Sequence, residues 1–152
     1  MTPSRLDARV VAERLAWIEQ MIAGIRALPL ESQAAFVADV RNVAAAESYL
    51  RRALEALLDL GRHVLAKGFG QPVAEYKEIP RHLQRLAIID EAGATLMTKL
   101  AGYRNRMVHF YAQVSTAELY DICARQLGDV VSCAEALRAW IAAHPDQVDH
   151  AL

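Results

Sequence analysis

Apolar residues recur every three or four positions along most of this 152-residue chain. The clearest example lies toward the C-terminus and consists of Tyr120, Cys123, Leu127, Val130, Ala134, Leu137 and Ile141. This spacing puts about one apolar residue per turn on one side of an α-helix, and the alternating pattern of a half-buried strand never extends over a useful length. Alanine, the best helix former, supplies 28 residues. The sequence therefore predicts an all-α protein whose helices each bury one apolar face.

Five helices with short links are expected. They cover residues 4–28, 32–67, a short stretch that starts at about 80, around 96–108, and 115–143. Ser4 is the expected first N-cap, and Ser115 and Glu118 form a capping box at the start of the last helix. A loop is expected at 68–78 and a turn at 90–93. Stripes of this spacing pack as near-antiparallel neighbours, which indicates an up-and-down bundle of four or five helices. We expect one domain at residues 1–144 and a flexible tail at 145–152.

The charge balance limits the kinds of partner. Seventeen Lys and Arg residues face eighteen Asp and Glu residues, which gives a net charge of −1 and disfavours a histone-like or polybasic binder of nucleic acid. A local basic site is compatible with this balance. Fourteen of the seventeen cations are Arg, a bias that suits bidentate recognition of phosphate or carboxylate. GC-rich coding explains the bias equally well.

The remaining composition indicates a cytoplasmic protein. Cys123 and Cys133 lie ten positions apart in one expected helix, beyond the reach of a disulfide, and are expected to be core thiols. No apolar run approaches the roughly 18 residues of a membrane span, and the N-terminal segment has no signal-peptide core. We therefore expect a soluble protein without a membrane partner.

Two pairs of titratable residues have the spacing of metal ligands on a helix. Asp59 and His63 are four apart, as are Glu78 and His82, yet neither pair has a clear match on another helix. Ion pairs or solvated faces are the favoured interpretation. Motifs of phosphate loops, zinc proteases and serine hydrolases are absent from the sequence, so we expect neither a metal nor a cofactor.

The segment at 102–111, GYRNRMVHFY, is unusually polar for a stretch between apolar regions. Arg104 and His109 are five apart, about 140° around an ideal helix, and so do not share one face. Either the helix ends here or two copies of the chain meet. Asn105 and His109 are four apart, so the amide could bond the imidazole and select its tautomer.

This segment resembles the R-x4-H-x-Y motif of the HepT-like branch of the HEPN superfamily, the toxins of HepT/MntA toxin–antitoxin pairs. The likeness extends upstream through ESYLRRALEALLDLGRHVLAK, the P-x-x-x-Y at 72–76, the E-I at 78–79 and the stretch LAIID. Together these cover about residues 41–111 in the order expected of the family.

The resemblance implies an all-α HEPN-type bundle that acts as a homodimer and cleaves RNA, either tRNA or mRNA, without a metal ion. Arg104 and His109 become the catalytic pair of this endoribonuclease, facing their symmetry mates across a shared cleft. Tyr111 becomes the residue that an MntA-like nucleotidyltransferase antitoxin modifies by AMPylation, as in a type VII toxin–antitoxin system.

Elementary chemistry is consistent with these roles. Cleavage without a metal needs a base for the ribose 2′-hydroxyl, an acid for the 5′-oxygen and positive charge beside the phosphorane. The motif holds one His per chain, which is short of both proton transfers, and a dimer supplies two such residues. An adenylyl group on Tyr111 would bring negative charge that Arg104 could bind in place of substrate.

Three further side chains are weaker candidates for support of the site. Glu47 breaks the apolar stripe of the second helix and could orient Arg104 or His109, although an ion pair with Arg51 is the simpler expectation. Arg106 could contact RNA, although a surface salt bridge is its more ordinary fate. Asn105 completes the group through its expected bond to His109.

Two other interpretations of the polar segment remain open. In the first, the protein is a catalytically silent helical subunit that dimerises, docks a nucleotidyltransferase and presents a nucleotide pocket. In the second, the segment is a polar helix end whose arginines cap carbonyl groups. The presence of Arg104, His109 and Tyr111 together favours the enzyme, because a scaffold has no chemical need for all three.

Overall fold

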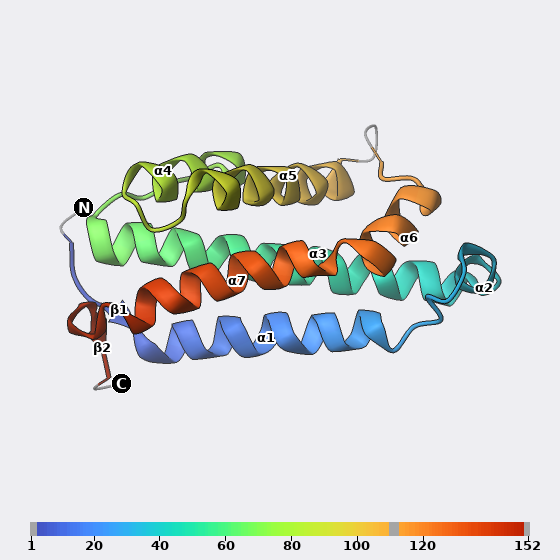
Figure 1. The fold of residues 1–152 in the computed structure, drawn as a ribbon, viewed down its shortest axis with the longest axis horizontal. Helices are drawn as coiled ribbons and strands as arrows, with labels where there is room; N and C mark the ends of the chain where they lie inside the picture. The colour runs from blue at the N-terminus through green and yellow to red at the C-terminus, as the bar shows by residue number, and fades with distance from the viewer. Residues whose placement is uncertain (1–2, 110–112, 151–152) are drawn as a thin grey trace.

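The computed structural model describes residues 3–109 and 113–150. Its α-helices are α1 (Ala8–Arg26), α2 (Gln33–Val37), α3 (Val40–His63), α4 (Ile79–Arg85), α5 (Glu91–Val108), α6 (Thr116–Arg125) and α7 (Leu127–Ala142). Helix α3 packs against α1, α4, α5, α6 and α7, and the long helices share one direction of elongation in Figure 1. The predicted all-α bundle is confirmed.

Helix α1 buries the predicted stripe but begins later than expected. Val11, Leu15 and Ile18 are among its buried residues, as their spacing requires. The N-cap is Asp7 and not Ser4: the Asp7 carboxylate accepts hydrogen bonds from the backbone N–H of Arg9 and Val10. The chain stays extended before this point because Leu6 and Asp7 form a short strand, β1.

The helix predicted over residues 32–67 is divided. Ser32 caps α2, and a second cap at Asp39 starts α3, with its carboxylate accepting from the Arg41 N–H. The break turns Phe36 fully into the core, while Val40 is 80% exposed. At the other end α3 continues into a π-helical turn, Val64–Gly68.

The predicted turn at 90–93 belongs to a helix. Asp90 is the N-cap of α5, and its Oδ1 accepts from the Gly93 N–H at 2.7 Å. The chain reverses earlier, after α4, where Ala87 takes a positive φ of 59°. An Asp followed by Glu91 in the first turn is a favourable helix start, so the residues interpreted as a turn signal act as a cap.

The C-terminal helix predicted at 115–143 is also divided. Its start is confirmed, since the Ser115 Oγ accepts from the Glu118 N–H at 3.1 Å. At Gln126 the backbone leaves the helical region, with φ −118° and ψ 7°, and separates α6 from α7. The break lets α6 place Tyr120 against Phe36, and the Tyr120 hydroxyl donates to the Leu30 carbonyl at 2.8 Å.

Residues 145–149 have regular structure where a flexible tail was predicted. Pro145–Gln147 form a 3₁₀ turn, and Val148–Asp149 form β2, which pairs in parallel with β1. Leu6 is fully buried and Val148 is 8% exposed. Figure 1 shows this pairing at the end of the bundle where α1 begins and α7 ends. Burial of two apolar side chains explains why the tail joins the fold.

The core confirms the two cysteines as buried free thiols. Burial raises the pKa of Cys123 to about 12 and, with the nearby Asp129 carboxylate, that of Cys133 to about 11. Both therefore stay protonated at neutral pH. Among the helices of the described segments, none combines the length and apolar character needed to cross a membrane.

Candidate functional site

The C-terminal end of α5 positions the polar segment. Ala94, Met97, Leu100 and Ala101 form the buried face of this helix. Arg104 follows Leu100 by one turn and so continues the buried stripe toward α3. Its side chain is 24% exposed. A guanidinium thus occupies the place where the helix pattern would otherwise put an apolar residue.

Arg104 lies between a carboxylate and an aromatic ring. Its Cζ atom is 4.6 Å from the centroid of Tyr76, in the 3₁₀ turn Tyr76–Glu78. Its Nε lies 3.9 Å from the Glu55 Oε1 on α3, beyond hydrogen-bond range. This Nε is buried and has no hydrogen-bond partner within the described part of the chain. The Nη1 atom donates to the Asn105 Oδ1 at a long 3.4 Å.

The two partners of Arg104 are themselves held in place. The Arg51 Nη1 donates to the Glu55 Oε1 at 2.8 Å, and the Tyr76 hydroxyl donates to the Asp59 Oδ1 at 2.8 Å. Arg62 lies 4.7 Å from the Tyr76 centroid and also pairs with Asp59 at 3.5 Å. These contacts join α3, the 3₁₀ turn and α5 into one polar network.

Tyr76 remains a neutral hydrogen-bond donor in this network. Burial raises the pKa of its hydroxyl to about 12, and the bond to the Asp59 carboxylate acts in the same direction. The positive charges of Arg62 and Arg104 oppose this rise with smaller effects. The hydroxyl therefore keeps its proton throughout the physiological range.

His109 is the first residue after α5, so the helix ends within the polar segment, which is one of the two alternatives that the sequence left open. Its backbone is extended, with φ −104° and ψ 104°, and its side chain is exposed. The expected pairing with Asn105 assumed an uninterrupted helix, which stops at Val108. The Asn105 Oδ1 accepts a bond from Arg104. Tyr111 lies outside the described residues.

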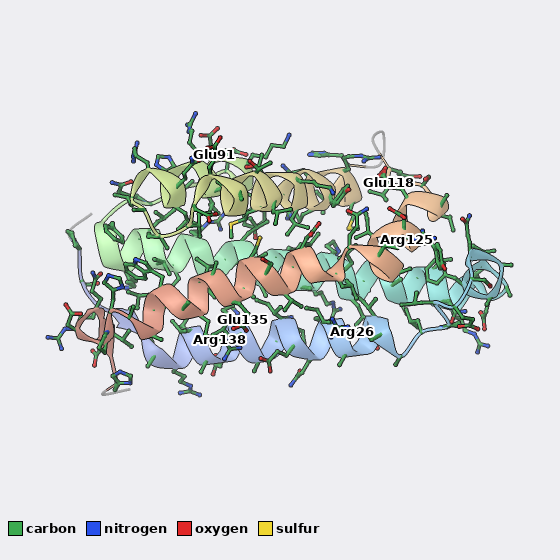
Figure 2. The ribbon with its side chains drawn as sticks, in the orientation of Figure 1. Arg26, Glu91, Glu118, Arg125, Glu135 and Arg138 are labelled. Atoms are coloured by element: carbon green, nitrogen blue, oxygen red, sulfur yellow. The ribbon has the colours of Figure 1, made fainter. Side chains whose placement is uncertain are left out.

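Arg106 points to the start of α6 and not to Arg104. Its Nη1 donates to the Glu118 Oε1 at 2.5 Å, and its Nη2 reaches the Gln113 carbonyl at 3.5 Å. Figure 2 labels Glu118 at the start of α6, close to the end of α5. This is the surface salt bridge that the sequence offered as the ordinary alternative to an RNA contact.

Glu47 lies beside the C-terminal end of α5. It lines a cavity of about 240 Å³ together with Met107, Val108 and Leu119. The ion pair expected between Glu47 and Arg51 is replaced by the bond from Arg51 to Glu55. The carboxylate that faces Arg104 is thus Glu55, eight positions farther along α3.

The two pairs with metal-ligand spacing are engaged in other contacts. Asp59 bonds Tyr76 and Arg62, and the His63 Nε2 accepts from the Asp7 N–H at 3.0 Å. Glu78 pairs with Arg81, and the Nδ1 of His82 lies 2.9 Å from the Arg85 Nη2. In the segments that the structure describes, no group of three or more potential metal ligands occurs.

Sequence reasoning missed the roles of Glu55, Tyr76 and the Asp59–Arg62 pair. Glu55 carried a signal, because Glu47, Arg51 and Glu55 are spaced by four and share one helix face. Tyr76 was part of the P-x-x-x-Y resemblance without a stated function. Its contact with Arg104 joins segments distant in sequence, which helical periodicity does not report.

Comparison with known proteins supplies a family and a fold. A family model described as ribonuclease HepT-like matches residues 18–137. No curated protein sequence matches this chain.

Several solved structures share the fold at low sequence identity. A tri-AMPylated HEPN toxin of Shewanella oneidensis in complex with MNT antitoxin aligns with a TM-score of 0.77 and 18% identity, over 86% of this chain and 97% of that one. YutE, a cytosolic protein of unknown function from Bacillus subtilis, aligns with a TM-score of 0.76 and 19% identity, over 96% and 98%. A toxin–antitoxin complex with AMP-PNP aligns with a TM-score of 0.76 and 18% identity, over 86% and 98%.

Proposed function

Because this chain belongs to the ribonuclease HepT-like family, we propose that it is a toxin of the HepT/MntA type and cleaves RNA without a metal ion. Arg104 and His109 carry the reaction. A nucleotidyltransferase antitoxin neutralises the toxin. The shared fold with a HEPN toxin solved with MNT antitoxin supports the toxin–antitoxin assignment.

The observation that carries this proposal is the state of the Arg104 guanidinium. Its Nε is turned into the protein, its Nη1 makes one long bond to Asn105, and its Nη2 makes none to the described residues. The donors that suit a phosphate are therefore still available. A guanidinium fork binds two oxygens of a phosphodiester at once and stabilises the charge of the phosphorane.

His109 supplies the proton transfer. In the cleavage step a base removes the proton of the ribose 2′-hydroxyl, and the resulting oxygen attacks the phosphorus. The bond from phosphorus to the 5′-oxygen breaks, and an acid protonates that oxygen. The products are a 2′,3′-cyclic phosphate and a 5′-hydroxyl. Imidazole is the side chain used most often for such transfers, because one of its nitrogens can accept a proton and the other can donate one.

Two protomers complete the reaction. The motif of a single chain offers one imidazole, His109, for two proton transfers, and His109 lies on extended backbone beyond the helix that carries Arg104. A twofold axis close to the end of α5 would bring two Arg104 and two His109 side chains to one phosphodiester. Because His109 is exposed, it is accessible to a second copy and to RNA.

Regulation acts on the same segment. AMPylation of Tyr111 adds a phosphate and a large base seven positions after Arg104. The added phosphate competes with the RNA phosphate for the Arg104 fork, and the base fills space that RNA needs.

The decisive experiment measures cleavage of a labelled single-stranded RNA by the purified protein in the presence of EDTA. The wild type should give products with cyclic phosphate ends. Arg104→Ala and His109→Ala should lose at least about a hundredfold in rate, as expected when a charge-stabilising donor or a general base is removed. Arg9→Ala is the control, since Arg9 is 74% exposed and pairs with Glu13 away from the site.

The alternative hypothesis, that the protein is a catalytically silent docking subunit, predicts the opposite result. It would bind the nucleotidyltransferase, yet wild type and Arg104→Ala would leave RNA equally intact. That result would reject the ribonuclease proposal.

A further inference from the structure

We propose that Tyr76, which lies outside the R-x4-H-x-Y segment, is a positioning residue that holds the Arg104 guanidinium where it stabilises the charge of the phosphorane. The inference rests on the proposed function, since Arg104 is the group that it serves. Tyr76 belongs to the 3₁₀ turn between α3 and α4, so its placement depends on a different part of the fold from the motif.

The contacts of Arg104 show what is available to hold it. A buried Nε without an acceptor leaves the guanidinium without the strong bond that usually orients such a group. The Glu55 oxygen at 3.9 Å attracts it by charge and makes no hydrogen bond. The ring of Tyr76, whose centroid lies 4.6 Å from the Arg104 Cζ, offers the guanidinium a flat surface that can orient it. Attraction between a cation and an aromatic ring favours this arrangement.

Tyr76 is itself fixed, which a positioning residue must be. Its hydroxyl donates to Asp59 at 2.8 Å, and the Arg62 guanidinium lies 4.7 Å from its ring centroid. Arg62 is tied in turn to the Ala74 carbonyl at 2.9 Å. The position of the ring is therefore set by Asp59, Arg62 and the turn, independently of Arg104.

An aromatic ring has an advantage over a carboxylate at this point. A carboxylate paired bidentately with Arg104 would neutralise its charge and occupy the donors that the phosphate requires. The ring orients the guanidinium while the Nη donors and the positive charge remain available. The nearest carboxylate, Glu55, is kept on Arg51 by a 2.8 Å bond.

The test compares Tyr76→Leu, which removes the ring, with Tyr76→Phe, which keeps the ring and loses only the hydroxyl. The matched control is Tyr103→Leu, because Tyr103 also lies by a cation, Lys99 at 5.8 Å, and bonds Gln126. We expect Tyr76→Leu to lower kcat for RNA cleavage about tenfold with little change in KM. Tyr76→Phe should retain activity within about threefold, and Tyr103→Leu should behave as the wild type.

A second readout does not depend on activity. In the NMR spectrum of arginine Nε–H groups, the Arg104 signal is identified by its loss in Arg104→Lys. Ring currents from Tyr76 should displace this signal in the wild type and in Tyr76→Phe. It should return toward the position of free arginine in Tyr76→Leu and stay displaced in Tyr103→Leu.

The outcomes separate the two proposals. An undisplaced Arg104 signal in the wild type, or an unchanged kcat in an active Tyr76→Leu, overturns the role of Tyr76. A rise in KM with kcat unchanged also overturns it. A wild type that cuts no RNA overturns the proposed function and with it the catalytic meaning of the contact, while the displaced signal would still establish the contact itself.

Discussion

Glu55 faces two arginines with the same carboxylate oxygen. Its Oε1 accepts a 2.8 Å hydrogen bond from Arg51 on its own helix and lies 3.9 Å from the Nε of Arg104 on α5. The pair with Arg51 lies at i and i+4 on α3 and so forms locally. Arg104 is attracted by the same charge without being bound by it, and its charge remains available to an anion.

Removing the Arg51 side chain should lower RNA cleavage. In Arg51→Ala the Glu55 carboxylate is free to bond Arg104, which would occupy donors meant for phosphate. We expect a loss of about three- to tenfold in kcat/KM. The second change Glu55→Gln should restore the rate, because the amide carries no charge. Cleavage assays on the two variants check this. Equal losses in Arg51→Ala and in the double variant would contradict the explanation.

Co-expression with a cognate MntA-like nucleotidyltransferase should add AMP to the protein through Tyr111. Intact-mass measurement is expected to show one or more AMP units on the wild type. The Tyr111→Phe variant lacks the phenolic oxygen and should keep its unmodified mass. Tyr103→Phe is the control and should be modified as the wild type is. An unmodified wild type, or a modified Tyr111→Phe, would remove the proposed regulation.

Substitution of two helical glycines by Ala should change stability in opposite directions. A Cβ at Gly61 would lie 2.9 Å from the Ile79 Cγ2 and 3.2 Å from the Leu83 Cδ1, both fully buried. At Gly128 a Cβ meets nothing within 4 Å. Urea unfolding should show a loss of about 1–3 kcal/mol for Gly61→Ala, from overpacking. Gly128→Ala should gain up to about 1 kcal/mol from helix propensity. If Gly61→Ala left the free energy of unfolding unchanged or raised it, α4 would have to shift easily to make room for the added methyl group.

His63 should make the fold sensitive to mild acid. Burial lowers its pKa below the ordinary 6.5, with Lys67 and Arg14 acting in the same direction and Asp7 opposing them. Above about pH 6.5 the imidazole is neutral in both the folded and the unfolded chain, and it adds no pH dependence. As the pH falls below that value the unfolded chain takes up the proton first, so stability declines until the folded pKa is passed.

The measurement is the free energy of unfolding in urea at pH 7.5 and at pH 5.5. His63→Gln keeps an acceptor for the Asp7 N–H and has no titrating group. The wild type should therefore lose more stability than His63→Gln between the two values. Parallel losses would show that other groups cause the acid sensitivity.

The strand pairing of the two terminal segments should contribute to stability. Val148 is 8% exposed in β2, whereas Val40 at the start of α3 is 80% exposed. Val148→Ala removes buried methyl groups and should cost about 1–2 kcal/mol. Val40→Ala should stay within about 0.5 kcal/mol of the wild type. Thermal and urea unfolding of both variants check the contrast, and equal effects would favour the flexible tail expected from the sequence.

The local features of this protein follow from its amino-acid sequence alone. The spacing of apolar residues identified the helices and much of their buried faces, because the direction of a side chain around a helix is set by the position of its residue in the sequence. Ser32 and Ser115, which the helix-start rules single out, do cap helices in the structure. The polar segment after Leu100 was also recognisable, since charged side chains are costly on a buried stripe.

The positions of the helix breaks and the contacts of Arg104 depend on how the helices pack together. The breaks at Asp39 and Gln126 fall where Phe36 and Tyr120 meet across the bundle, a contact between segments distant in sequence. Tyr76 reaches Arg104 through a turn whose place depends on the packing of α4 and α5 on α3. Periodicity describes one helix at a time, and such contacts depend on how several helices pack together.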